Sequence, residues 1–362
     1  MTDENAHGRG YRAVEILYHA YLTGLILTTV TRRSGADAAA LVFRTFRRQH
    51  LEKFLPGLAK LGLSALPHAV ACAQYHYLSN HLGGVRVEYM PESDRKAWVR
   101  YLPPRWIYDG AAICGVPTEV SSAMLRGWHA HNGVSLGNAR LGFVCTKQTT
   151  DGQPGLEGYY LEYDRDLAPE ERLRFAPHED GPDFDPARAP RLEGEDWPAE
   201  RFRKVARNYS MDYVRTILPV LSETFGDEEA RALGGRTGLL IGMQYYTETA
   251  DLLGVTGDGA EDFAEYLVRI GRAQDDRIER VRDGGDVVVR QHTWRLMQGV
   301  PSPPAAVFDA WNALWQGALS VHNRHLALEV RGRLDEGDPC FEWRVHPEGM
   351  RPPRHRPGWP PA

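Results

Sequence analysis

The sequence predicts an α+β fold made of two similar tandem units. Apolar residues first recur at helical spacing over three stretches and then alternate as in paired strands. The same order returns in the second half: three helices, a hairpin, one helix and a second hairpin. Identical residues recur at a nearly constant spacing, as in the pairs Tyr18/Tyr209 and Glu157/Glu342. Each unit is therefore expected to combine a helical N-terminal part with a small antiparallel sheet from two hairpins and an intervening helix.

The first unit is predicted to cover 1–167. Its elements are three helices at 11–33, 37–54 and 67–82, a hairpin at 85–89 and 97–101, a helix at 117–134, and a hairpin at 140–148 and 158–163. Ser34-Gly35 is expected to end the first helix, and Pro56-Gly57 to break the second.

The second unit is predicted to cover 199–347. Its helices are expected at 199–225, 227–253, 260–272 and 303–321, and its strands at 277–282, 286–292, 324–332 and 339–345. Segment 168–198, rich in Pro and acidic residues, is interpreted as an exposed linker, and 348–362 as a Pro-rich tail.

Composition narrows the classes of function. The chain has 362 residues with 43 Lys and Arg against 48 Asp and Glu, a net charge of −5, which argues against nucleic acid or an anionic membrane as partner. The N-terminus is polar, and the apolar stretch 16–30 is interrupted by His19, Thr23 and Gly24, so neither a signal peptide nor a membrane span is expected. A cytoplasmic protein is the prediction.

Known chemical motifs are missing from the sequence. It has no glycine-rich nucleotide loop and no His or Cys spacing typical of zinc, so we expect neither a cofactor nor a metal. The four Cys are too scattered for a disulfide framework.

Histidines supply the candidate catalytic groups. Glu15 and His19 share one helix face, whereas the second unit has Ala206 and Ser210 there. Such a pair could orient a basic imidazole, or it could be an ordinary surface pair. Cys72 and His76 also share a face, as a nucleophile pair or simply as buried packing.

Two further histidines lie late in the helix at 117–134. His129 and His131 are two residues apart, so on a continuous helix only one can face a pocket. The alternative is that they interact with the helix dipole. Abundant Trp and Tyr either wall a ligand pocket between the units or form core packing.

The closing segment 331–343, with sequence RGRLDEGDPCFEW, resembles the last hairpin of the L-2-amino-thiazoline-4-carboxylic acid hydrolase-like family. The helix and Asn at 305–323 fit the same pattern, and 138–160 repeats it more loosely. The resemblance implies hydrolysis of a small cyclic amidine-like C–N bond. The family tends to place Cys at three positions in each unit, and of these positions only the one in the closing hairpin is a Cys here, Cys340. Cysteine chemistry is therefore not expected to be central.

The leading hypothesis is a small-molecule hydrolase acting on a C–N bond, with water as nucleophile and its pocket mainly in the first unit. His129 or His131 would act as general base, Glu15 and His19 would support it, and Asp109 and Tyr101 would donate or orient. The ligand is expected to be aromatic or heterocyclic, and a homodimer is left open. The alternatives are a non-catalytic ligand-binding or sensor protein and a structural scaffold.

Overall fold

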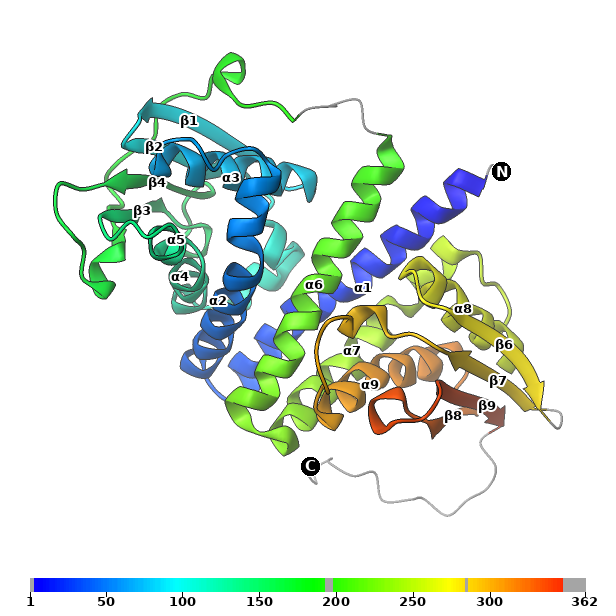
Figure 1. The fold of residues 1–362 in the computed structure, drawn as a ribbon. Helices are drawn as coiled ribbons and strands as arrows, with labels where there is room; N and C mark the ends of the chain where they lie inside the picture. Colours follow the sequence, from blue (N-terminus) through cyan, green and yellow to red (C-terminus); the bar gives the residue numbers. More distant parts are fainter. Residues whose placement is uncertain (1–2, 193–197, 284–285, 348–362) are drawn as a thin grey trace. The chain divides into compact units, whose positions relative to one another are not determined.

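The computed structural model describes residues 3–192, 198–283 and 286–347 and has the predicted α+β class. The chain divides into two compact units. The central unit is Thr29–Ala206, and the C-terminal unit joins Met1–Thr28 to Arg207–Ala362 (Figure 1). This division differs from the predicted boundaries at 1–167 and 199–347, because the first helix packs with residues more than 200 positions later.

The central unit carries a five-stranded sheet with the order β1-β2-β4-β3-β5. Its strands are β1 (Val87–Ser93), β2 (Lys96–Tyr101), β3 (Leu141–Lys147), β4 (Leu156–Glu162) and β5 (Leu173–Phe175). All neighbours are antiparallel except β3 and β5. The helices are α2 (Gly35–Lys60), α3 (His68–Leu82), α4 (Thr118–Gly127) and α5 (Asn132–Ser135). Helix α3 packs against β1, β2 and β4, and α5 packs against β3.

The start and the end of α2 differ from expectation, although α1 (Asp3–Arg32) does end just before Ser34. Ser34 is the N-cap of α2, accepting a hydrogen bond from Asp37 N at 3.0 Å, and is not a C-cap of α1. Pro56 does not break α2, which runs on to Lys60. The last turn of α2 is held because Gly57 lies directly against the ring of Tyr75.

The predicted helix at 117–134 is interrupted. Helix α4 ends at Gly127, where a Cβ would lie 2.7 Å from the carbonyl oxygen of Phe43, so α2 and α4 approach closely. A 3₁₀ turn, His129–His131, and the short α5 follow. The interruption turns His129 and Asn132 into the core, where both are buried.

The predicted linker at 168–198 is partly built into the sheet. Leu173–Phe175 forms β5 and pairs with β3, so the expectation of an exposed linker is wrong for this stretch. Residues 193–197 of the predicted linker, and the predicted tail at 348–362, lie outside the described residues.

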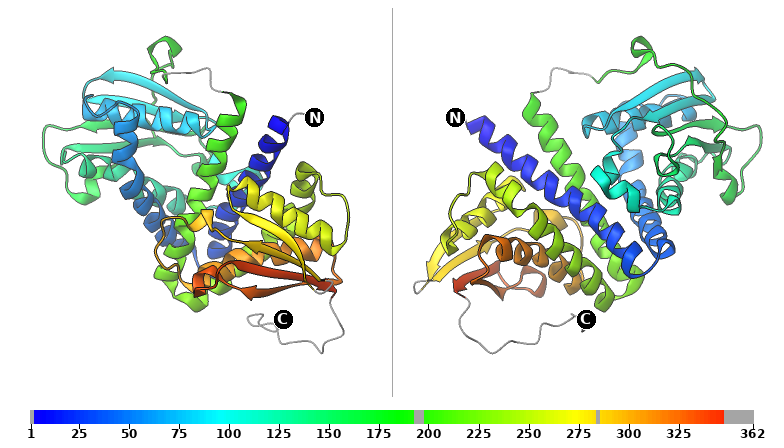
Figure 2. Two further views of the ribbon diagram at one scale, coloured as in Figure 1. Left: turned by 45° about the vertical axis from the view of Figure 1, so that its right-hand side comes forward. Right: turned by 180° about the vertical axis from the view of Figure 1, so that it is seen from behind.

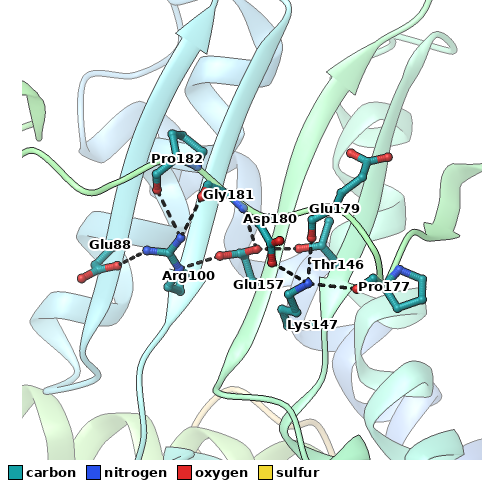
Figure 3. A network of polar contacts seen from close by, with 10 residues as sticks. All are labelled: Glu88, Arg100, Thr146, Lys147, Glu157, Pro177, Glu179, Asp180, Gly181 and Pro182. Carbon is teal, nitrogen blue, oxygen red and sulfur yellow. Dashed lines mark hydrogen bonds and ion pairs between the residues drawn. The ribbon is translucent and has the colours of Figure 1, made fainter.

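The stretch after β5 crosses the other face of the central sheet, and we call residues 177–182 the strap (Figure 3). Beneath it Glu157, almost fully buried, bonds Arg100 Nε at 2.5 Å, Thr146 Oγ1 at 2.8 Å and the strap amide of Gly181 at 3.0 Å. Lys147 Nζ donates to the strap carbonyls of Pro177 and Glu179. Charge-assisted bonds therefore tie the strap to the sheet.

The C-terminal unit has a four-stranded antiparallel sheet with the order β6-β7-β9-β8, from β6 (Ile278–Asp283), β7 (Asp286–Gln291), β8 (Leu326–Gly332) and β9 (Phe341–Pro347). Its helices are α7 (Asp227–Leu253), α8 (Ala260–Ala273), α9 (Ala305–His322), and the parts of α1 (Asp3–Arg32) and α6 (Ala199–Phe225) that fall within the unit. Helices α7 and α9 meet closely at Gly242, where a Cβ would lie 2.0 Å from the carbonyl oxygen of Leu314.

Helix α1 is part of the core of this unit and runs beside α7 in the view from behind (Figure 2). Tyr21 Oη lies 2.8 Å from the carbonyl oxygen of Gly234. Tyr18 Oη donates to Gln274 at 2.8 Å and accepts from Trp311 Nε1 at 2.9 Å. These buried bonds explain why the helix belongs with residues of the second half.

The apolar stretch 16–30 was not expected to span a membrane, and this expectation is wrong as to the length of the helix that contains it. His7–Arg32 is one continuous helix with a mean hydropathy of 1.4, long and apolar enough to cross a membrane. In this structure 61% of that window is buried inside the protein, as in a core helix, although a signal sequence passes the same length test.

Candidate functional site

A continuous row of hydrogen-bonded side chains crosses the core of the central unit. It consists of Arg47 and His50 from α2, Asn132 from α5, His76 from α3, Tyr101 from β2, and His129 from the turn after α4. We call these six residues the histidine chain. All except Arg47 are buried, and Asn132 and His50 are fully so.

Each neighbouring pair is within hydrogen-bond distance. Arg47 Nη1 lies 2.9 Å from His50 Nδ1, and His50 Nε2 lies 3.1 Å from Asn132 Oδ1. Asn132 Nδ2 lies 3.4 Å from His76 Nε2. His76 Nδ1 lies 2.9 Å from Tyr101 Oη, which is 3.3 Å from His129 Nε2.

Arg47, at one end of the histidine chain, determines which group donates in each hydrogen bond as far as Tyr101. A guanidinium can only donate, so His50 accepts at Nδ1 and carries its proton on Nε2. His50 then donates to Asn132, whose amide nitrogen therefore faces His76 and donates to its Nε2. The amide's other hydrogen goes to Tyr160 Oη at 3.0 Å.

The same logic continues to the far end of the histidine chain. Since His76 accepts at Nε2, its proton is on Nδ1 and is donated to Tyr101. Tyr101 has one hydroxyl proton to donate, and His129 Nε2 is an acceptor for it at 3.3 Å. When Tyr101 donates there, His129 carries its own proton on Nδ1, a buried atom with no hydrogen-bond partner among the described residues.

Burial keeps these histidines neutral. Desolvation, assisted by Arg47 and His131, lowers the pKa of His50 to about 3, and desolvation, assisted by His50, lowers that of His76 to about 3. Desolvation also lowers the pKa of His129 well below its usual value, and the charges of His76 and Arg105 act in the same direction. The site therefore offers a neutral imidazole N–H donor and not an imidazolium.

The rings are also fixed by stacking. The ring centroids of His76 and His129 are 4.2 Å apart and the rings are nearly parallel, and the centroids of His129 and Phe143 are 4.6 Å apart. On the other side of the chain, His50 stacks on Phe54 at 4.8 Å. Packing of this kind holds a donor in one orientation, as a binding or catalytic site requires.

Two further polar groups of the loop after β2 bear on the site, Arg105 and Tyr108. The guanidinium of Arg105 lies over the Tyr101 ring, with Cζ 5.2 Å from its centroid, and Nη2 contacts Met124 Sδ at 3.7 Å. Tyr108 is almost fully buried, and its hydroxyl has no partner among the described residues. Burial raises the pKa of Tyr108 to about 12, so it carries its proton at neutral pH.

The structure brings together only two of the predicted site residues, Tyr101 and His129. His131 is half-buried outside the histidine chain, with Nδ1 2.7 Å from the carbonyl oxygen of Arg126. Asp109 is exposed and caps the start of the next 3₁₀ helix by accepting from Gly110 N.

The other predicted residues belong to the C-terminal unit. Glu15 pairs with Arg12 at 2.9 Å on α1, and His19 is half-buried on the same helix. Cys340 is buried just before β9, where desolvation raises its pKa. These residues do not share a unit with His129 and do not form one site with it in the central unit.

Sequence reasoning missed most of the histidine chain. His76 was weighed only beside Cys72, a fully buried thiol whose pKa burial raises. His50, Asn132 and Arg47 carried no motif. The one available indication was the abundance of His in the first half of the chain.

The histidines do not form a metal site in the part of the chain that the structure describes. Among residues 3–192, 198–283 and 286–347, no group of three or more His, Cys, Asp or Glu side chains could hold a metal ion. Each ring nitrogen within the histidine chain already has a hydrogen-bond partner, except Nδ1 of His129.

Comparisons with protein-family models, with curated proteins and with solved structures gave no match. The resemblance to the hydrolase-like family therefore rests on the sequence alone, in segments 331–343 and 305–323 and more loosely in 138–160.

Proposed function

We propose that the central unit is a small-molecule hydrolase that acts on a C–N bond, with His129 as the group that polarises the substrate. The observation that carries the proposal is the buried Nδ1 of His129, which has no partner among the described residues and is an N–H donor when Tyr101 donates to Nε2. A fixed, desolvated donor is the element needed to stabilise an oxygen that becomes negative in a transition state.

In this mechanism water adds to the carbon of the scissile bond. The substrate atom that gains the electron pair, the carbonyl oxygen of a lactam or the imine nitrogen of an amidine, accepts the Nδ1–H of His129. One proton of the water passes to the leaving nitrogen, the other stays on the hydroxyl of the new acid or, in an amidine, passes to the imine nitrogen, and the C–N bond breaks. Tyr101 keeps His129 in the donating tautomer, in the way that an orienting partner does in other histidine sites. His129 therefore serves as a hydrogen-bond donor, whereas a general base would need the opposite tautomer.

A pair of variants tests the proposal. The purified chain is incubated with small cyclic amidines and lactams in H₂¹⁸O, and products are followed by mass spectrometry. His129→Gln is expected to lower kcat/KM by about 10²–10³-fold, because one oxyanion donor is lost. His131→Gln is the matched control and is expected to change it less than about threefold, since His131 lies outside the histidine chain. Equal loss in both variants would remove His129 from its proposed role.

A second candidate is a non-catalytic ligand-binding protein. The observation that favours it is that His50, His76 and His129 all stay neutral near pH 7, so the site holds few groups able to move a proton. In that case metabolites would co-purify with the chain, be lost in His129→Gln, and come through the incubation unaltered.

We also propose that the two halves arose by duplication. Supporting this, the sheets share the strand orders β1-β2-β4-β3 and β6-β7-β9-β8. A cross-strand Arg–Glu pair recurs in matching places, Arg100 with Glu157 and Arg290 with Glu342. In both sheets the strand that pairs with the glutamate's strand, β3 or β8, has a register shift that places Lys147 opposite Glu157 and Gly332 opposite Glu342. Superposition of the two sheets with their helices is the test.

For location and partners the proposal is a cytoplasmic protein with a small organic ligand. The near balance of charge and the burial of most of α1 support this. Fractionation of cells expressing the tagged chain tests the location.

A further inference from the structure

We infer that the ligand of the central unit carries a carboxylate and that Arg105 binds it. The inference rests on the proposed function, since it concerns the same ligand, and it adds the chemical class of that ligand. It is carried by three groups with unused donors: Arg105, which lies over the ring of Tyr101, His129, which bonds to the hydroxyl of Tyr101, and the buried Tyr108.

Arg105 is one of the arginines of the central unit that have no carboxylate partner among the described residues. Arg100 pairs with Glu88 and Glu157, and Arg140 with Glu162, whereas Arg86, Arg174 and Arg188 bond to uncharged oxygens. Arg105 is half-buried, yet within the described part of the chain it pairs with no carboxylate. Its side-chain contacts are the thioether of Met124 and the ring face of Tyr101, and neither neutralises a charge.

Contacts of this kind leave the guanidinium fork available. A stacked, partly desolvated arginine keeps its planar N–H groups free for two parallel bonds, which fit the two oxygens of a carboxylate. Stacking on Tyr101 also limits its rotamers, so less side-chain entropy is lost when a ligand binds.

The neighbouring donors have the polarity that an oxygen-rich ligand needs. His129 presents a neutral N–H, and Tyr108 presents a buried O–H whose oxygen has no partner among the described residues. Arg105 is close enough to both to influence their ionisation electrostatically. All three groups can donate, and a buried donor without a partner costs about 1–3 kcal/mol, so an acceptor is the missing element.

Charge decides between a carboxylate and a neutral acceptor. Within the described residues around Arg105 no acidic side chain offsets its charge, so an anionic ligand gains a charge-assisted bond that a neutral amide does not. Arg105 would then bind the carboxylate, and His129 would donate to the atom where charge develops during hydrolysis.

Acetate and acetamide are suitable probes because they share a shape and differ in charge. With the full chain labelled with ¹⁵N-histidine, the imidazole signals of His129 are followed by NMR while each probe is added. Acetate is expected to shift the His129 signals and to bind at least about tenfold more tightly than acetamide. Arg105→Gln is expected to weaken acetate about 10–100-fold and to leave acetamide unchanged, as expected for the loss of a charge-assisted, bidentate partner.

Two further variants complete the test. Arg126→Gln, an exposed arginine on α4, is the matched control and should bind acetate as the wild type does. Arg105→Lys keeps the charge without the planar fork and should fall between wild type and Arg105→Gln. It also covers the case in which Arg105→Gln fails to fold.

The outcomes separate this inference from the proposed function. If both probes shift His129 equally in wild type and in Arg105→Gln, the site is a ligand site but Arg105 is not its anchor, and the inference is overturned alone. If neither probe shifts His129 at molar concentration, both the inference and the proposed site fail. If acetate binds tightly and only Arg105 variants lose it, the inference holds.

Discussion

Glu157 offers the sharpest test of how the central sheet is stabilised, because the chain contains its own control. In the central sheet Glu157 is 5% exposed, pairs with Arg100 and bonds Thr146 and the strap amide of Gly181 (Figure 3). In the C-terminal sheet Glu342 makes the matching pair with Arg290 at 2.7 Å, but the two side chains are 20% and 37% exposed. The same substitution therefore removes a buried pair in one sheet and a largely solvated pair in the other.

The expected magnitudes follow from burial. Removal of one partner of a buried pair costs about 3–5 kcal/mol. Arg100 keeps Glu88 at 2.8 Å and some contact with water, so we expect Glu157→Gln to cost about 2–3 kcal/mol of unfolding free energy. Glu342→Gln should cost about 0.2–1 kcal/mol, the range for exposed pairs.

Hydrogen exchange measured by mass spectrometry can assign the loss to a unit, whereas the unfolding midpoint of the whole chain does not say which unit is destabilised. In Glu157→Gln, amides of β2, β4 and the strap should exchange about 30–100-fold faster, and those of β7 and β9 should not change. Glu342→Gln should leave the β2 and β4 amides unaltered. If Glu342→Gln accelerates exchange in β7 and β9 as much as Glu157→Gln does in β2 and β4, burial under the strap adds nothing to the stability of the Arg100–Glu157 pair.

Two other predictions concern stability. The folded pKa of His50 and His76 lies near 3, below the ordinary 6.5, so the unfolded chain binds more protons between these values. The stability of the central unit is therefore full above pH 6.5 and falls as the pH drops towards 3, by up to about 1.4 kcal/mol per pH unit for each histidine. Urea titrations of wild type and His76→Gln at pH 7, 6, 5 and 4 measure this, and a pH-independent midpoint would contradict it. Gly242→Ala places a Cβ against the Leu314 carbonyl and should cost about 1–3 kcal/mol, whereas Gly235→Ala on the same helix meets open space and should gain about 0.5–1 kcal/mol. Thermal unfolding of the pair measures this, and equal midpoints would refute the close approach of α7 and α9.

Local patterns predicted most of the elements correctly. The helices at 199–225 and 227–253 agree with the structure residue for residue, because long helical stretches that end at a glycine, Gly226 or Gly254, depend little on their surroundings. The expected break at Pro56 and the expected continuous helix at 117–134 are wrong because tertiary contacts decide there: Gly57 packs on Tyr75, and Gly127 packs on the backbone of α2. No sequence pattern contains those neighbours.

The candidate site was harder to predict for the same reason. Tyr101 and His129 were predicted separately, and a bond between β2 and the turn after α4 joins them. His50, His76 and Asn132 come from three further elements and form one chain only after the fold brings them together. Glu15 and His19 show the opposite case: their spacing on α1 is real, but α1 packs into the other unit.

The cores beside the two sheets differ in their chemistry. In the C-terminal unit the residues beside the sheet are tightly packed aromatics, with Trp311, Phe341 and Trp343 in mutual ring contact. Asn312 there accepts a hydrogen bond from Trp343 Nε1, and the neighbouring Trp294 Nε1 is a buried donor without a partner among the described residues. In the central unit Asn132 instead joins His50 to His76 in a row of hydrogen-bonded side chains that leads to His129. A single buried donor without a partner therefore does not distinguish the two units. The row of buried polar side chains does, because such a network is costly unless each member is satisfied. That cost is the argument for placing the proposed ligand site in the central unit.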